Sequence, residues 1–250
     1  MGFFSNVFSK STKTDTPVDL SQLGCDVHSH LIPGIDDGAQ TMDDSINLIK
    51  ELYHLGFKKI ITTPHTMSDF YRNTSETILG GMEKVRVELK NAGIPVQLEA
   101  ASEYYLDYDF EQKIEKEPLL TFGKKKYLLF ELSFINPPDN LYQAIFNMQM
   151  KGYKPVLAHP ERYNYWHRNF SKYEDLIEKG VLLQVNLSSL AGYYSPETKK
   201  IAEQMIEKNM ISLLGTDCHH ERHVAAAKNA LYEKSLHQLV QSGLLLNKEL

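Results

Sequence analysis

A histidine pair near the N-terminus has the spacing of two ligands to one metal ion. His28 and His30 are separated by one residue, and in an extended strand such positions point to the same face. Asp36 and Asp37 follow shortly afterwards in a turn bounded by glycines. Taken alone, this pattern belongs more often to paired surface or core histidines, so its meaning depends on the rest of the chain.

Ligand-type residues recur further along the chain, where short apolar runs end. Asp217 and His219 repeat the spacing of the first pair. In parallel α/β barrels the carboxyl ends of the strands share one rim, which holds the active site. We therefore expect a metal site at this rim, since so many such residues would not meet there by accident. The candidates are His28, His30, Asp36, Asp37, His65, Glu103, Glu131, His159, Asp217 and His219.

The number and type of these candidates indicate the metals and the chemistry. One tetrahedral zinc ion needs four ligands, so the larger set favours two or three metal ions with bridging carboxylates. Imidazole and carboxylate ligands without a thiolate favour Mn, Fe or Zn over Cu or Ca. Such a cluster chiefly serves hydrolysis, because closely spaced metal ions lower the pKa of a bridging water and clamp the attacked centre.

One basic side chain on the predicted rim suits a phosphoryl group. Arg162 stands three residues after His159, and a guanidinium can bind a phosphoryl group through two parallel hydrogen bonds. Its plainer interpretation is a salt bridge to Glu161 or to a neighbouring carboxylate. Arg222 is a candidate second phosphate contact, with a solvated charge as the alternative. Aromatic residues after three of the strands either wall a pocket or pack the loops: Tyr104, Tyr105, Tyr163, Tyr165, Trp166, Tyr193 and Tyr194.

The chain that positions these residues alternates apolar runs with amphipathic helical patterns. Seven such strand–helix units without a hairpin signal predict parallel pairing in a closed (β/α)7 barrel, with an open doubly wound sheet as the alternative. No glycine-rich dinucleotide or P-loop motif follows a strand. The predicted strands cover 24–28, 58–63, 95–101, 127–132, 155–158, 181–187 and 210–214.

The helical patterns give more local predictions. Thr41 and Asp44 suit the cap of a helix over 42–55, and Gly80 and Gly81 make the start of the next helix irregular. A short helix is predicted over 108–116 and a final continuous helix over 223–241. The residues expected to point inward include Ile46, Ile49, Leu52, Tyr53 and Leu55 in the first helix, and Tyr173, Leu176 and Ile177 in a later one.

Length and composition suit one domain over 21–250 after a flexible leader over 1–20. The leader lacks the apolar core of a signal peptide, and the alternative for its phenylalanines is an aromatic patch that docks on a partner or a membrane. No apolar run approaches the ~20 residues of a membrane span. A net charge of −5 argues against a nucleic-acid partner.

The chain has only two cysteines, Cys25 and Cys218, which excludes a disulfide framework. We therefore predict a cytoplasmic location, where thiols stay reduced. Each cysteine stands beside a candidate ligand, but strand alternation points it away from that neighbour. We interpret both as small packed residues rather than as nucleophiles.

The motifs together resemble those of the PHP (polymerase and histidinol phosphatase) superfamily, and their order is kept over 24–219. Within it, the chain is similar to the capsular-polysaccharide-type, manganese-dependent protein tyrosine phosphatases. The resemblance rests on Asp-x-His-x-His with a following Asp-Asp-Gly, Thr-Pro-His65, Ser-Glu103-Tyr-Tyr, Phe-Glu131, His159-Pro-Glu-Arg162 and Thr-Asp217-x-His219.

The resemblance implies a distorted (β/α)7 TIM-like barrel of the PHP type with a site for three metal ions. Mn²⁺ is the implied metal, with Fe, Co, Zn or Mg as alternatives. Asp36 would replace Asp37 if the register shifted by one residue. The implied ligands are His28, His30, Glu103 and Asp217 for one ion, a bridging Glu103 with Glu131 and His159 for the second, and Asp37, His65 and His219 for the third.

The reaction implied by the resemblance is in-line attack of metal-bridging hydroxide on the phosphorus of protein phosphotyrosine, without a phosphocysteine intermediate. The implied catalytic residues are Arg162, Asp217 and His159, and the predicted substrate contacts are Arg162, Arg222 and Tyr165. Arg222 comes earlier in the chain than the second arginine usual in the family. The family's usual substrate is the tyrosine-rich tail of a bacterial tyrosine kinase of exopolysaccharide or capsule synthesis.

Three other functions compete with this one. A histidinol-phosphatase-like small-molecule phosphatase would use the same site inside a more enclosed pocket. A phosphodiesterase is disfavoured by the acidic balance and by the absence of basic grooves. A non-enzymatic metal-dependent binding module is disfavoured by the completeness of the ligand set.

Overall fold

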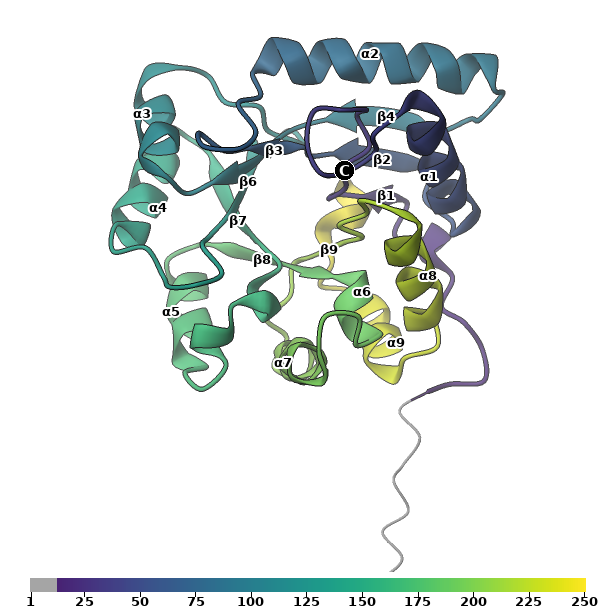
Figure 1. The fold of residues 1–250 in the computed structure, drawn as a ribbon. Helices are drawn as coiled ribbons and strands as arrows, with labels where there is room; N and C mark the ends of the chain where they lie inside the picture. The colour runs from purple at the N-terminus through teal and green to yellow at the C-terminus, as the bar shows by residue number, and fades with distance from the viewer. Residues whose placement is uncertain (1–12) are drawn as a thin grey trace, which may run out of the picture.

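Within residues 13–250, the part of the chain that the computed structural model describes, short parallel strands form a ring with helices packed around its outside (Figure 1). The strands are β1 Cys25–Asp26, β2 Lys59–Thr62, β3 His65–Thr66, β4 Gln97–Ala100, β5 Glu103–Tyr105, β6 Tyr127–Glu131, β7 Lys154–Ala158, β8 Leu182–Asn186 and β9 Leu213–Gly215. The helices are α1 Met42–His54, α2 Ser75–Asn91, α3 Tyr108–Lys116, α4 Leu141–Met150, α5 Ser171–Glu178, α6 Leu187–Leu190, α7 Pro196–Glu207, α8 Glu221–Ala230 and α9 Lys234–Gln241. Short 3-10 helices are η1 Leu20–Gln22, η2 Pro160–Arg162, η3 Asn164–Trp166 and η4 Leu246–Glu249.

The strands occupy seven positions around the ring, and two of these positions are broken in the middle. One sheet has the order β1-β2-β4 and the other the order β3-β5-β6-β7-β8-β9, with parallel pairing throughout. β3 continues the line of β2 after a gap at Pro64, which has no N–H for the ladder. β5 continues β4 after a gap at Ala101 and Ser102. The second and third predicted strands are therefore each split in two.

Backbone hydrogen bonds join the first strand to the last and close the ring. The amide of Asp217 donates to the carbonyl of His28 over 2.8 Å, and the amide of His30 donates to the carbonyl of Cys218 over 2.9 Å. Ser29 and Cys218 form the matching parallel bridge. The predicted distorted (β/α)7 barrel is thus confirmed, and the open-sheet alternative is wrong.

Two layers of apolar side chains hold this barrel together. A smaller cluster fills the ring, and a larger one packs the outer faces of the strands against the helices. At the amino end of the strands, the side chain of Asn247 in η4 bonds to the backbone of Leu214 and Cys25, so the C-terminal segment covers the interior. Fully buried members of the inner cluster include Ile61, Ala101, Leu129, Val156 and Leu213.

The cap predicted for α1 is confirmed, but its buried face is rotated from the prediction. Thr41 accepts a hydrogen bond from the amide of Asp44, and the Asp44 carboxylate accepts one from the amide of Thr41. Tyr53 is only half-buried, and its ring lies under the ammonium of Lys58. Ile46 and Leu55 are also half-buried, and Ile177 of α5 is 37% exposed. The face of α1 that is buried consists of Ser45, Leu48, Ile49 and Leu52.

The predicted continuous helix over 223–241 is wrong, because the helical conformation is interrupted between α8 and α9. Glu233 has an extended backbone there, with φ −78° and ψ 132°. Its carboxylate is buried and bonds to the ammonium of Lys199 on α7 over 2.8 Å. This tertiary ion pair fixes the break.

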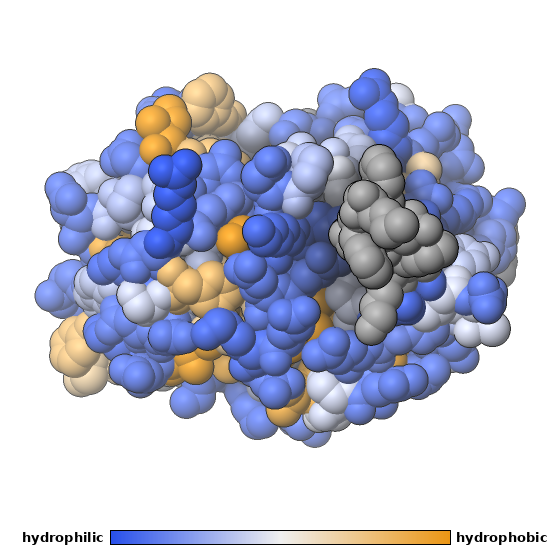
Figure 2. Space-filling model, turned by 90° about the horizontal axis from the view of Figure 1, so that it is seen from below, coloured by the Kyte–Doolittle hydropathy of each residue, from blue (hydrophilic) through white to orange (hydrophobic). Residues whose placement is uncertain are grey.

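The part of the predicted leader that the structure describes is packed against the body of the protein. The amide of Thr14 donates to Tyr232 O over 2.7 Å, the amide of Val18 donates to Leu231 O over 2.8 Å, and Leu20 is completely buried. The phenylalanines of the leader lie in 1–12, outside the described residues. In the described range no helix has both the length and the apolar character that crossing a bilayer requires. Figure 2 shows that hydrophilic side chains dominate the face seen from below, with hydrophobic ones in separate patches.

Replacing Gly80 by alanine is expected to stabilise the protein by about 1 kcal/mol, the cost of a glycine inside a helix. α2 runs without interruption from Ser75 through both glycines, contrary to the predicted irregular start. No atom lies within 4 Å of the place that a Cβ would take at Gly80, whereas Cγ2 of the buried Ile32 lies 2.3 Å from that place at Gly81. Gly81→Ala should therefore be destabilising. Urea unfolding of the two variants measures both effects, and two variants of equal stability would contradict the packing.

Candidate metal centre

His28 and His30 meet at the carboxyl end of the strands, as their spacing predicts. Both side chains are completely buried, and their Nε2 atoms lie 3.2 Å apart. The other ring nitrogen of each is held by a polar side chain. His28 Nδ1 lies 2.6 Å from Gln184 Oε1, and His30 Nδ1 lies 2.8 Å from Asp36 Oδ2. These partners fix the orientation of both rings and leave both Nε2 atoms facing one space.

Glu103 lies at the centre of the cluster and is completely buried. Its Oε2 is 3.2 Å from His28 Nε2, 3.4 Å from His30 Nε2 and 3.2 Å from His65 Nδ1. Its Oε1 lies 3.0 Å from His159 Nε2. β5 begins at Glu103, directly after the gap in its strand, so the break delivers this carboxylate to the site. One carboxylate therefore touches four imidazoles: His65 from β3, His28 and His30 from the segment after β1, and His159 directly after β7.

The two carboxylate oxygens of Asp217 have different partners. Oδ1 faces the imidazoles, 3.3 Å from His28 Nε2. Oδ2 accepts hydrogen bonds from Asn186 Nδ2 over 2.6 Å, from Arg162 Nη1 over 3.1 Å and from the Tyr194 hydroxyl over 3.1 Å. The backbone of Asp217 is left-handed, with φ 51°, a strained conformation that its three donors help to hold.

The acidic turn after β1 divides its two carboxylates between two roles. Asp36 accepts from His30 and from the amide of Gly38, so it turns away from the cluster. Asp37 Oδ1 lies 3.5 Å from His65 Nε2 and 3.4 Å from His219 Nε2. A Cβ at Gly38 would lie 2.1 Å from the carbonyl oxygen of His30, so only glycine lets the turn approach this closely. The geometry supports Asp37, not Asp36, as the ligand-type residue.

The electrostatics of the cluster pair each buried acid with imidazoles. Burial would raise the pKa of Glu103, but His28 and His65 hold it well below its ordinary range. Burial would also raise the pKa of Asp217, but His28 and His219 hold this pKa well below its ordinary value. Conversely, Glu103 and Asp217 overcome burial and raise the pKa of His28 to about 9.

This set of donors fits divalent metal ions. Four groups of these residues each place their ligand atoms within 4.8 Å of one another. His65 Nδ1 lies 3.1 Å from Glu131 Oε1, yet it and His159 Nδ1 are buried without a hydrogen bond. Nitrogen and oxygen atoms that approach closely without hydrogen-bond geometry are what ligands around a shared cation present. The groups are His30, Asp37, His65 and His219; His28, His30 and Glu103; His28, His159 and Asp217; and His65, Glu103 and Glu131.

A pocket of about 290 Å³ opens onto the cluster, and six of the predicted ligands line it. Arg162 lies in its wall between two aromatic rings, with Cζ 4.6 Å from the centre of the Phe134 ring and 4.2 Å from that of Tyr194. Cation–π contacts on both faces hold the guanidinium in one plane. His223 completes the wall, and burial lowers its pKa to about 3, so it is neutral at pH 7.

Residues 24–242 match the sequence model of the capsular polysaccharide synthesis family CpsB/CapC. The chain belongs to this family. Tyrosine-protein phosphatase YwqE of Bacillus subtilis (strain 168) is 32% identical over 195 residues, which cover 78% of this chain and 77% of YwqE. Tyrosine-protein phosphatase CpsB of Streptococcus agalactiae is 28% identical over 200 residues, 78% of this chain and 82% of CpsB.

Solved structures extend the CpsB/CapC relationship to the fold. One chain, described with YwqE from Bacillus subtilis and CpsB from Streptococcus pneumoniae as unique metal-dependent tyrosine phosphatases, superposes with a TM-score of 0.77. It is 30% identical and covers 90% of this chain and 95% of its own length. A histidinol phosphate phosphatase from Lactococcus lactis shares the fold at a TM-score of 0.50 and 14% identity, covering 88% of this chain and 93% of its own.

Two of the three predicted substrate contacts lie away from the pocket of this CpsB/CapC member. The hydroxyl of Tyr165 donates to Ser133 O over 2.9 Å, so this side chain supports a loop. Arg222 is exposed in the first turn of α8 and does not line the pocket. Cys25 and Cys218 are buried, and burial raises the pKa of both thiols, which confirms them as packed residues.

Sequence reasoning missed three residues that shape the site. Gln184 and Asn186 end β8 and hold His28 and Asp217 in place. Their two-residue spacing at a strand end is the signal that identifies the other members of the site, but amides were not counted as candidates. Phe134 lies in an irregular loop, and no local pattern marks it.

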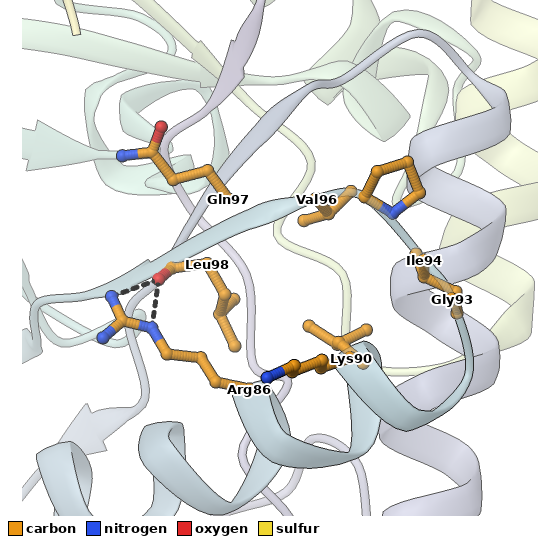
Figure 3. A pocket seen from close by; sticks show the side chains of 9 residues that line it. Arg86, Lys90, Gly93, Ile94, Val96, Gln97 and Leu98 are labelled. Carbon is orange, nitrogen blue, oxygen red and sulfur yellow. Dashed lines mark hydrogen bonds between the residues drawn. The ribbon is translucent and has the colours of Figure 1, made fainter.

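A second pocket, of about 540 Å³, lies between α2 and β4 (Figure 3). Arg86 donates from Nε and Nη2 to the carbonyl of Leu98, over 2.8 Å and 2.5 Å, and so closes one side of it. Its other lining residues include Lys90 and Ile94, and none of them is an acid or a histidine. It offers no metal ligands, so the chemistry belongs to the rim of the barrel.

The affinity of the cluster for Mn²⁺ is expected to rise with pH. With a pKa of about 9 in the metal-free protein, His28 carries a proton at pH 7. A metal ion must displace that proton, and this becomes easier as the pH rises toward 9. Isothermal titration calorimetry at pH 6 and pH 8, in buffers of different ionisation enthalpy, measures affinity and proton release together. Affinity that does not change with pH, without proton release, would contradict this expectation.

Proposed function

We propose that this protein is a metal-dependent protein tyrosine phosphatase. The observation that carries the proposal is the Arg162 guanidinium, stacked between two aromatic rings at the mouth of a buried carboxylate–imidazole cluster. A guanidinium suits a phosphoryl group, and aromatic walls suit a phenyl ring. The tyrosine phosphatase names of the relatives YwqE and CpsB support the same assignment.

We assign the metal ligands as three sets, of which the first two share Glu103, with Mn²⁺ as the proposed metal. The mixed oxygen and nitrogen donors without thiolate support this choice. When bound, the ions supply positive charge to a phosphoryl group and lower the pKa of water. The proposed ligands are His28, His30, Glu103 and Asp217; Glu103, Glu131 and His159; and Asp37, His65 and His219.

Arg162 binds and orients the substrate in this proposal. Nη1 is its only nitrogen hydrogen-bonded to Asp217, so the remaining N–H donors of the guanidinium are available to phosphoryl oxygens. Phe134 and Tyr194 hold the planar guanidinium in one orientation and provide the wall for the phenyl ring. Asp217 and His159 act from the floor of the pocket, where they fix the donors that face the phosphorus.

We further propose that the substrate is a phosphotyrosine protein of capsule or exopolysaccharide synthesis, such as the C-terminal tail of a bacterial tyrosine kinase. The capsular polysaccharide synthesis family supports this setting. We propose a cytoplasmic location, which the two free cysteines favour, because such thiols persist in a reducing compartment.

The metal-loaded protein is expected to hydrolyse a phosphotyrosine peptide, fastest with Mn²⁺ among Mn²⁺, Co²⁺, Zn²⁺ and Mg²⁺. Excess chelator should abolish turnover, and a thiol-alkylating agent should not, because both thiols are buried away from the pocket. Phosphate release measures the rates, with elemental analysis of the protein in parallel. If histidinol phosphate or bis-p-nitrophenyl phosphate is hydrolysed faster than the phosphotyrosine peptide, the proposed substrate class is wrong.

Replacing Tyr194 tests the stacked guanidinium. Tyr194→Phe keeps the ring over Arg162 and loses the hydroxyl that donates to Asp217. Tyr194→Leu loses both the ring and the hydroxyl. Since a cation–π contact contributes about 0.5–2 kcal/mol, kcat/KM should fall about tenfold further in the leucine variant. Tyr165→Phe is the control and should behave as the wild type. Equal losses in both Tyr194 variants, at unchanged metal content, would show that the ring contact does not matter.

A further inference from the structure

Two loops and the start of α3 expose large apolar side chains to solvent on one side of the pocket mouth. Phe70 is 76% exposed, Tyr108 is 72% exposed and Ile135 is 87% exposed. We call these three residues the apolar arc. Exposed apolar side chains that gather at one place mark interaction sites, whereas single ones need no explanation.

The three residues of the apolar arc follow three neighbouring strands. Phe70 comes four residues after the end of β3, Tyr108 three residues after β5, and Ile135 four residues after β6. These strands are consecutive in the sheet, where neighbours are about 4.8 Å apart. The loops after β3 and β5 are also tied together, because the amide and the hydroxyl of Ser68 both donate to Asp107 Oδ2, over 3.0 Å and 2.8 Å.

Both ends of the apolar arc continue into the metal pocket. Next to Ile135, the ring of Phe134 stacks on His159 with centroids 5.6 Å apart. At the other end, Phe70 contacts Tyr71 with ring centroids 6.5 Å apart, and Tyr71 stacks on His65 with centroids 5.6 Å apart. The apolar arc is therefore within reach of a molecule whose phosphoryl group enters the pocket.

The opposite side of the mouth differs in character. The loop after β1 turns Leu31 and Ile32 into the core and exposes Asp37 and Gln40. The turn after β9 exposes polar side chains as well: His220, Glu221 and Arg222. On this side Tyr193, which lies against His223, is 37% exposed, so the larger apolar surface is on the side of the arc.

We propose that the apolar arc binds apolar side chains of the substrate polypeptide that flank the phosphotyrosine on one side. This inference rests on the proposed function, since a phosphotyrosine of a protein has neighbours that must cross the rim. At ~3.3 Å per residue, three or four extended residues span the arc. Both signs of charge adjoin the arc, since Asp69 and Arg72 flank Phe70 and Asp109 and Lys113 lie on α3, so apolar character rather than charge distinguishes the flanking segment.

The test compares a large and a small substrate on two matched triple variants. The arc variant carries Phe70→Ser, Tyr108→Ser and Ile135→Ser. The control variant carries Val87→Ser, Phe146→Ser and Met150→Ser, which are 57%, 54% and 70% exposed on α2 and α4. All six side chains are exposed, so folding should be unaffected. The substrates are O-phosphotyrosine and short phosphotyrosine peptides flanked by Leu and Phe, by Ser, or by Glu.

The arc variant should lose about tenfold in kcat/KM on the apolar peptide, mainly through KM, and nothing on O-phosphotyrosine. Wild type and control variant should prefer the apolar peptide over both the serine peptide and the glutamate peptide. An unchanged rate of the arc variant on the apolar peptide, or an equal loss on O-phosphotyrosine, would overturn the proposal. A change of oligomeric state in the arc variant, measured by light scattering, would instead assign the arc to a second copy of this chain.

A readout that does not need turnover separates this inference from the proposed function. Fluorescence anisotropy of labelled apolar peptide, with metal-loaded protein, should show weaker binding by the arc variant than by the control variant. If the wild type hydrolyses neither O-phosphotyrosine nor the peptides, the proposed function fails. If the two triple variants bind the peptide equally well, the proposed role of the apolar arc is wrong, while the proposed function is unaffected.

Discussion

The upper end of this barrel depends on keeping several buried charges paired. Glu103 and Asp217 are almost completely withdrawn from water, and a carboxylate in that position is very costly without partners. Inside the cluster, the surrounding imidazoles offset this cost by pairing with the two carboxylates. On the outside, Gln184, Asn186 and Asp36 hold the atoms that do not face the cluster. His28, His30 and Asp217 are thus each oriented twice, once by the cluster and once by the scaffold.

The broken strands serve the same requirement. β2 pairs with β1 on one side and with β4 on the other, and these strands bury apolar side chains, as the lower part of a barrel must. The chain then loses the ladder at Pro64 and at Ser102 and resumes it in β3 and β5, whose first residues are His65 and Glu103. The irregularity lies directly below two of the residues that the cluster needs, so regular pairing is given up where side-chain placement matters most.

Local spacing and the shared rim of a parallel barrel were enough to identify the ligand-type residues. They could not separate Asp36 from Asp37, because that choice depends on how a turn folds around Gly38. They also misjudged Tyr165, whose hydroxyl is engaged by a loop from another strand. The break at Glu233 escaped prediction for the same reason, since its partner Lys199 lies on a distant helix. Interactions between residues far apart in sequence leave no periodic trace in either segment.

Closure of the ring between its first and last strands has a consequence for how the protein is made. Asp26 and Thr216, which bond across this seam, are 190 residues apart in the chain. During synthesis, the first histidines leave the ribosome long before the segment that completes their surroundings, so the centre forms only after nearly the whole chain has been released. Metal loading is therefore a late event, and an unfinished chain in the cell has no hydrolytic centre with which to act on the wrong phosphoester.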